Sequence, residues 1–485
     1  MENYKFLLCF GNFTNEEKRA VEFLTEKFSE YHNYVLPAKG ADSVTDADLS
    51  GNNLIIVGTT RDNSVLNRLE KDGIYTHTQC SQGYDIKICK SIFNEECKMI
   101  IISGKDPSGC LFGAVDFVSY VTSVLDTQNP MQRYPGNVFS SELLTDFEMT
   151  SSPRIAMRGI WTWGHVVYDY KKYIKNMAKL KFNTLILWND CLPVNIRDVI
   201  DEAHSFGIKI YLGYSWGWNE ARPENGGLDI SDEKILSDLQ NTIVENYKNE
   251  FSSLPIDGIY FQSFTETEKD EINGVVIAKR VVEFINETAD RILSVSPNLL
   301  LMFGLHASSV SEKMQYIRNT DKRIMIVWED LPAFPYSYTP RVLSDFDVTV
   351  EKSKEIASLR EKGELFGVVT KGLTCLDWET FSHMDGEFVM GASSDEFIKE
   401  RFRQKEKLWA YVDAYWVKNA SYAKEILNLL SDENKNTLVT GLIEDGVIEE
   451  KIPLSVRIFS EMLWDAKEET EGIILKSMLG TASDI

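Results

Sequence analysis

Short apolar segments alternate with longer amphipathic ones from residue 154 to about residue 393, and this alternation restricts the possible folds more than any other feature of the chain. The apolar segments have the length of buried strands, and they lie at residues 155–163, 183–188, 209–214, 258–264, 299–305, 323–327 and 365–369. Helical patterns follow at residues 170–180, 194–206, 232–247, 275–293 and 351–362. With a weaker eighth strand near residues 387–390, the pattern predicts an α/β fold, a parallel (β/α)8 TIM barrel, whose typical length is roughly 250 residues. An open doubly wound sheet is the alternative.

The sequence on either side of this alternation predicts three further segments. Residues 1–125 combine buried strands with amphipathic helices and are expected to form a small α/β domain. Residues 126–153 are rich in turn-forming residues and predict a linker before the barrel of residues 154–393. Residues 394–485 are largely helical in pattern, and we expect the last barrel helix and a C-terminal helical region there.

Charge and composition exclude several classes of partner. The chain has 74 acidic and 51 basic residues, a net charge of −23, which argues against binding to the phosphates of a nucleic acid. No window has the ~18 consecutive apolar residues of a membrane span, and the N-terminus lacks the basic start of a signal peptide. Seven cysteines without a Cys-x-x-Cys pair favour a reducing compartment, so we expect a cytoplasmic protein. The C-terminal helices could form a homodimer.

Polar and aromatic side chains follow the predicted strands, where each strand ends. The carboxyl ends of parallel barrel strands meet at one face, which carries the catalytic residues in such folds. We expect these side chains to line one mouth of the barrel: Trp161, Trp163, His165, Trp188, Asn189, Asp190, Trp216, Trp218, Glu266, Glu268, His306, Trp328, Glu329, Asp330, Lys371, Asp377 and Trp378. Any one of them could instead be a structural hydrogen-bonding or core residue.

Indole rings interleaved with carboxylates, amides and histidines suit a sugar, whose C–H faces stack on rings while its hydroxyls need paired hydrogen bonds. Cleavage of a glycosidic bond requires two carboxylates, one of them protonated. Glu266 is the predicted general acid because it follows an apolar strand with aromatic neighbours. Asp330 and Glu329 are the leading candidates for base or nucleophile, with Asp377 and Glu379 behind them. The remaining residues of the mouth are expected to bind substrate. Single, scattered histidines give little support to a metal-dependent hydrolase, so we expect neither metal nor organic cofactor.

Two stretches of the first 125 residues resemble a domain found in known glycosidases. Gly83-Tyr-Asp-Ile-Lys-Ile, followed by Met99-Ile-Ile-Ile-Ser-Gly-Lys-Asp-Pro-Ser-Gly-Cys-Leu-Phe-Gly-Ala, resembles the small α/β domain that precedes the catalytic barrel in α-glucuronidases and β-N-acetylhexosaminidases. Arg158-Gly-Ile-Trp, at the start of the first barrel strand, adds to this resemblance. It implies a glycoside hydrolase whose acid follows the fourth barrel strand, the position of Glu266. In the hexosaminidases another acidic residue directly precedes the acid, whereas Thr265 stands there in this chain.

Together these observations predict hydrolysis of a terminal glycosidic bond in a small oligosaccharide, most similar to the reaction of α-glucuronidases. A β-N-acetylhexosaminidase-like activity is the alternative among enzymes. A barrel that binds glycans without cleaving them is the alternative outside enzymes.

Overall fold

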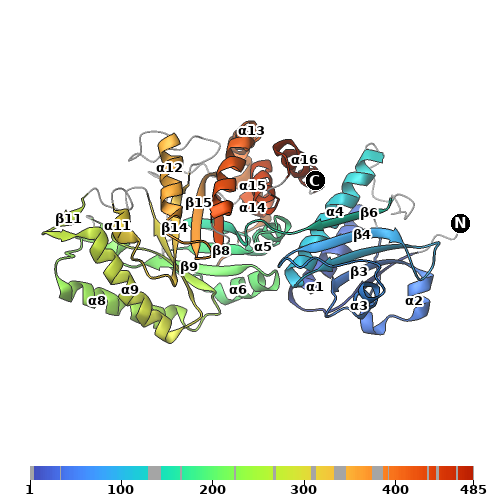
Figure 1. Ribbon diagram of the computed structural model, residues 1–485, viewed down its shortest axis with the longest axis horizontal. Coiled ribbons are helices and arrows are strands. Elements are labelled where there is room, and N and C mark those ends of the chain that lie inside the picture. The colour runs from blue at the N-terminus through green and yellow to red at the C-terminus, as the bar shows by residue number, and fades with distance from the viewer. Residues whose placement is uncertain are drawn as a thin grey trace.

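The computed structural model describes residues 5–32, 34–128, 144–163, 167–189, 191–222, 225–265, 269–306, 313–331, 346–373, 386–391, 393–433, 436–443, 447–465 and 468–483. The described residues form two main structures, a six-stranded sheet and a closed eight-stranded barrel (Figure 1). Figure 1 shows the six-stranded sheet and its helices, in blue, at one end of an elongated molecule, with the barrel beside them. The last helices, in red, lie on the barrel near the N-terminal domain.

The N-terminal sheet has the strand order β2-β1-β3-β5-β4-β6. Its strands are β1 (Phe6–Phe10), β2 (Ala38–Gly40), β3 (Asn53–Thr59), β4 (Tyr84–Lys90), β5 (Lys98–Gly104) and β6 (Phe147–Ser151). The helices of this domain are α1 (Asn15–His32), α2 (Asp46–Gly51), α3 (Ser64–Lys71) and α4 (Pro107–Gln128). Every residue of β3 is buried, because α1 and α4 pack on one face of the sheet and α3 on the other. The sixth strand, β6, lies within the segment that the sequence predicted to be a linker.

The barrel closes in the order β10-β13-β14-β15-β16-β7-β8-β9, and each of its strand pairs is parallel. The strands are β7 (Met157–Trp163), β8 (Thr184–Trp188), β9 (Lys209–Ser215), β10 (Gly258–Gln262), β13 (Leu300–Leu305), β14 (Ile324–Leu331), β15 (Phe366–Leu373) and β16 (Thr437–Ile443). The predicted TIM-barrel fold is therefore confirmed. The predicted position of its eighth strand is wrong, because β16 fills the gap between β15 and β7, and residues 387–390 form no strand.

Helices surround the barrel, together with the short ribbon of β11 (Glu271–Ile272) and β12 (Val275–Val276). The helices are α5 (Tyr170–Lys179), α6 (Ile196–Ser205), α7 (Trp218–Ala221), α8 (Glu233–Asn246), α9 (Ile277–Val295), α11 (Met314–Ile317), α12 (Phe346–Ala357), α13 (Asp395–Glu433), α14 (Val447–Glu450), α15 (Leu454–Trp464) and α16 (Thr470–Ser483). The 39 residues of α13 comprise two helical pieces that meet at Asn419, where the backbone leaves helical geometry. Among the described helices, none has the length and apolar character that crossing a membrane requires.

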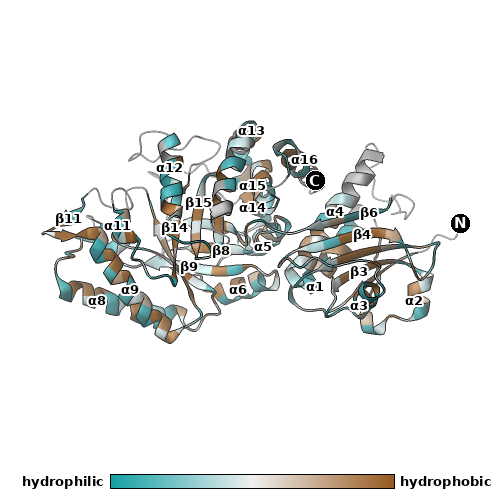
Figure 2. Ribbon diagram, in the orientation of Figure 1, coloured by the Kyte–Doolittle hydropathy of each residue, from teal (hydrophilic) through white to brown (hydrophobic). Residues whose placement is uncertain are grey.

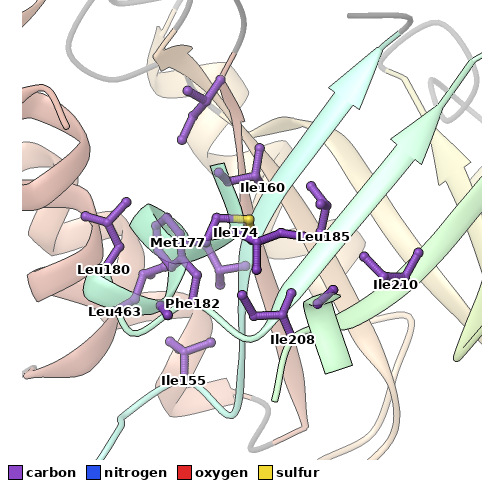
Figure 3. Packing of buried hydrophobic residues seen from close by; sticks show 14 of the residues in the cluster. Ile155, Ile160, Ile174, Met177, Leu180, Phe182, Leu185, Ile208, Ile210 and Leu463 are labelled. Atoms are coloured by element: carbon purple, nitrogen blue, oxygen red, sulfur yellow. The ribbon is translucent and has the colours of Figure 1, made fainter. Parts of the chain in front are cut away.

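The main apolar core lies between the barrel strands and their outer helices. Figure 3 shows one part of it, in which side chains of β7 and β8 pack against Met177 of α5. Leu463 of α15 reaches the same cluster. The hydropathy colouring in Figure 2 follows this arrangement, with apolar residues concentrated in the strands and polar residues on the outer faces of helices such as α8 and α9.

Charged side chains connect the N-terminal domain to the barrel. Arg19 of α1 donates hydrogen bonds to Glu202 (2.9 Å) and Ser205 of α6. Lys181, which is fully buried, pairs with Asp116 of α4 and with Glu461 of α15, both at 3.1 Å. One lysine before β8 thus holds together the N-terminal domain, the barrel and the C-terminal helices.

Candidate active site

Inward-facing aromatic side chains form a wall at the carboxyl ends of the first barrel strands. The ring centre of Trp163, the last residue of β7, lies 5.5 Å from that of Trp161, 4.6 Å from that of Trp188 and 5.3 Å from that of Trp218. Trp161 and Trp163 are two positions apart on one strand, so both point into the barrel. Trp163 and Trp188 end two neighbouring strands and Trp218 follows the next one, as the sequence predicted.

Glycine at position 213 of β9 provides the space that this wall needs. A Cβ atom there would lie 2.5 Å from the Trp188 ring. The indole of Trp188 therefore lies against the bare backbone of the adjacent strand. A side chain at this position would force the ring, and the Trp163 ring stacked near it, to move.

A hydrogen-bonded polar cluster lies at the carboxyl ends of β10, β13 and β14. Glu329 is its centre, and its side chain has no exposed surface. The Tyr260 hydroxyl donates to Glu329 Oε1, and the Gln262 side-chain amide donates to both carboxylate oxygens at 2.8 Å. His306 Nε2 lies 2.6 Å from Glu329 Oε2. Burial of a carboxylate is tolerated only when such partners replace water, and here they surround it.

Gly304 of β13 permits this close arrangement. A Cβ atom at that position would overlap both Glu329 Oε1 and the Tyr260 hydroxyl. Only glycine leaves room for the two side chains to meet inside the barrel.

Asp330 and Lys371 extend the cluster toward the rest of the site. Asp330 Oδ2 lies 3.5 Å from His306 Nδ1, so the imidazole stands between two carboxylates. The Lys371 ammonium lies 5.2 Å from the ring centre of Trp161, a cation–π distance. Because Trp161 also packs 5.9 Å from Tyr260, the ionic cluster and the indole wall adjoin one another.

Two of the predicted mouth residues point away from the barrel interior. Trp216 stacks on Phe261 with ring centres 3.7 Å apart, in the core between strands and helices. Trp328 donates a hydrogen bond from Nε1 to Ser353 of α12 (3.0 Å). The expectation that they line the mouth is wrong, because both belong to the core outside the barrel strands. Trp328 directly precedes the inward Glu329, and a register shift in β14 between Trp328 and Leu331 interrupts the alternation beyond it, where Asp330 lies near His306.

Seven of the predicted site residues lie outside the described part of the chain: His165, Asp190, Glu266, Glu268, Asp377, Trp378 and Glu379. Their roles stay predictions. Asn189, directly after β8, is described and partly exposed, and its Oδ1 atom is buried with no hydrogen-bond partner among the described residues. Within the described ranges, no group of three His, Cys, Asp or Glu side chains is arranged to hold a metal ion.

Sequence reasoning missed Tyr260 and Gln262. The prediction considered charged residues that follow each strand, whereas Tyr260 and Gln262 lie within β10. Their spacing of two positions, in a strand whose other residues are Gly, Ile and Phe, is the available signal. Both Gln262 Oε1 and Trp161 Nε1 are buried without a hydrogen-bond partner in the described part of the chain, which is unusual for polar atoms in a protein interior.

Comparison with known proteins relates the chain to others by fold. No protein-family model matches the sequence, and no curated protein sequence matches it. Among solved structures, a family GH115 4-O-methyl-α-glucuronidase with specificity for decorated arabinogalactans superposes with a TM-score of 0.53 at 12% identity, over 97% of this chain and 58% of that one. A GH138 enzyme targeting pectin rhamnogalacturonan II gives a TM-score of 0.49 at 11% identity, over 91% of this chain and 47% of that one. A family 89 glycoside hydrolase from Clostridium perfringens gives 0.46 at 9% identity, over 96% of this chain and 51% of that one. This chain thus spans about half the length of these structures, between 47% and 58%, and its similarity to the first of them is one of fold.

Proposed function

We propose that this chain is a glycoside hydrolase that removes a terminal sugar unit from a small oligosaccharide. The observation that carries the proposal is the buried Glu329–His306 cluster beside a wall of indoles, at the carboxyl ends of the barrel strands. Barrel enzymes carry their catalytic residues at this end. The fold shared with a 4-O-methyl-α-glucuronidase supports the same class of reaction.

The chemistry of the site favours a carbohydrate over a fully apolar ligand. The indoles offer flat apolar surfaces that suit the C–H faces of a sugar ring. Trp161 Nε1 can donate a hydrogen bond and Gln262 Oε1 can accept one, and neither atom has a partner among the residues that the structure describes. A hydroxyl group both donates and accepts, so it can satisfy atoms of either kind.

The proposed roles keep the assignments made from the sequence except that of Glu329, which is not proposed as base or nucleophile. Glu266, which follows the fourth barrel strand, β10, is the proposed general acid. Asp330 is the proposed base or nucleophile, with Asp377 and Glu379 as the other candidates. Asp330 is preferred because its carboxylate faces His306 at the end of β14 and its side chain retains 5% exposure. Two carboxylates on either side of a glycosidic bond suffice for hydrolysis.

A uronic acid is the proposed terminal sugar. The resemblance of the N-terminal domain to that of α-glucuronidases favours this choice, and the GH115 structure is that of a 4-O-methyl-α-glucuronidase. Lys371 is a basic side chain within the site, and such a group can pair with a sugar carboxylate.

A panel of substrates tests the proposal. Aryl glycosides and natural oligosaccharides with terminal α-glucuronic acid, 4-O-methyl-α-glucuronic acid, N-acetylglucosamine or neutral sugars would be incubated with the wild-type protein, and the products separated by chromatography. We expect release of a terminal uronic acid by the wild type and loss of that release in Glu266→Gln. Glu271→Gln, on the exposed β11 strand nearby, is the matched control and should retain activity. Binding of sugars without release of any product would favour a non-catalytic barrel.

A further inference from the structure

We propose that Glu329 is a positioning residue, and that it acts on the substrate only through His306, which it orients toward Asp330. The role in catalysis rests on the proposed function, whereas the arrangement itself can be tested without any substrate. The sequence placed Glu329 among the candidates for base or nucleophile, because it is a carboxylate near a strand end.

The hydrogen bonds that the Glu329 carboxylate already accepts argue against its acting as a base or nucleophile. A base or nucleophile needs an available lone pair and a path to the reacting carbon. The side chain of Glu329 has no exposed surface, and both of its oxygens accept hydrogen bonds from the Gln262 amide. Tyr260 donates to one oxygen as well, and His306 approaches the other. Attack would require the site to give up several charge-assisted hydrogen bonds.

His306 has the opposite environment. Its side chain is 27% exposed, directly after β13, so it lies between the buried Glu329 and the open end of the barrel. Nε2 faces Glu329 and Nδ1 faces Asp330. A neutral imidazole can donate a hydrogen bond from only one nitrogen, whereas the imidazolium donates from both. The negative charge of Glu329 therefore favours the form of His306 that can also hold Asp330.

The packing beneath Glu329 supports a fixed position. Gly304 leaves just the space that Glu329 and Tyr260 fill, so the carboxylate is held between β10, β13 and β14. Groups that face His306 in the described chain are Glu329 and Asp330 of β14 and Gln262 of β10. A group held in this way can orient its neighbours precisely, as carboxylates orient histidines in many active sites.

Nuclear magnetic resonance of the histidine rings tests the arrangement directly. Spectra of ¹⁵N-histidine-labelled wild type and Glu329→Gln would be recorded across a pH series, with His306→Gln to assign the signal. We expect the titration midpoint of His306 to fall in Glu329→Gln, because the uncharged amide no longer favours the imidazolium. His204, which pairs with Asp257 (2.9 Å) on a different part of the barrel, is the internal control and should not move. An unchanged His306 midpoint would overturn the proposal whether or not the protein cleaves sugars.

Kinetics on the glycoside found to be cleaved test the role in catalysis. Glu329→Gln and His306→Gln should each lower kcat by about 10²-fold, the cost of a small misplacement of reacting groups. The double variant should be no slower than either single variant, since both changes break the same chain of contacts. Additive losses, or a folded His306→Gln protein with nearly wild-type kcat, would contradict action through His306.

Chemical rescue separates positioning from nucleophilic attack. In Glu329→Ala, added azide should neither restore activity nor yield a glycosyl azide. Formation of that product would show that position 329 faces the anomeric carbon, and the positioning role would then be wrong. If the wild type cleaves no glycoside at all, the proposed function fails, while the histidine titration still decides the arrangement.

Discussion

The guanidinium carbon of Arg158 lies 5.0 Å from the centre of the Trp464 ring, and both side chains are buried. This contact joins the first barrel strand to the end of α15. The guanidinium also donates to the carbonyls of Lys181 and Ile155 and to the Gln82 side chain of the N-terminal domain. Burial lowers the pKa of Arg158, since the charged form loses water. A single cation therefore links the three parts of the chain through neutral acceptors.

Removal of this cation should destabilise the whole molecule. We expect Arg158→Ala to lower the free energy of unfolding by about 3 kcal/mol or more, because several buried acceptors lose their donor and a cavity remains. Urea denaturation followed by circular dichroism would measure the change. Arg61→Ala, at an exposed arginine, should shift stability by no more than about 0.5 kcal/mol. Equal effects of the two substitutions would show that Arg158 contributes little to the contact between domains.

A single methyl group at position 304 should disrupt the polar cluster. In Gly304→Ala the Cβ overlaps Glu329 and Tyr260, so we expect altered His306 signals and a loss of any sugar binding. Gly51→Ala is the matched control, since a Cβ there meets no atom within 4 Å. Unchanged His306 spectra in Gly304→Ala would mean that the strands can separate to accommodate the methyl group.

Stability should depend on pH through Glu449 of α14. Burial raises the pKa of this carboxyl from 4.5 to about 7, although the Tyr168 backbone N–H donates to it. Between these two values the folded protein holds a proton that the unfolded chain has released, so the free energy of unfolding falls as pH rises through this window, by about 3 kcal/mol in total.

Glu449→Gln should remove this pH dependence, because an amide does not ionise. Relative to wild type, we expect the variant to be similarly stable at pH 4 and more stable at pH 8, as measured by urea denaturation. Glu450→Gln, at the next and partly exposed position of the same helix, is the control. A stability difference between Glu449→Gln and wild type that is constant with pH would contradict the prediction.

Inward and outward tryptophans should respond differently to substitution. Trp218→Ala is expected to weaken sugar binding by about tenfold, roughly 1.4 kcal/mol, because its ring belongs to the indole wall. Trp328→Phe should leave binding unchanged and cost about 1 kcal/mol of stability, through loss of the hydrogen bond to Ser353. Isothermal titration with the cleaved oligosaccharide, alongside denaturation, would separate the two effects.

The barrel could be predicted from sequence because its first seven strands are continuous apolar segments followed by polar ends. The eighth strand, Thr437–Ile443, contains a glycine and two threonines and follows a long helix, so the sequence predicts another helix there. Pairing with β15 and β7 determines its structure, and that information is not local.

The site could be predicted only in part, for a geometric reason. Proximity to a strand end identifies which residues are near the mouth, and it correctly grouped Trp161, Trp163 and Trp188. The face to which a side chain points depends on its exact position along the strand, so the adjacent residues Trp328 and Glu329 point to opposite faces. Contacts such as that between Tyr260 and Glu329, which join residues far apart in sequence, leave no pattern in a single chain.

The position of β16 has a consequence for biosynthesis. A ribosome releases the chain from its N-terminus, so β7 to β15 and all of α13 are made before the strand that completes the ring. During that interval β7 and β15 have no neighbour on one side, and such open edges invite pairing with other chains. A nascent chain stalled before residue 437 is thus expected to aggregate or to engage chaperones, whereas β16, once it has left the ribosome, would seal both edges at once.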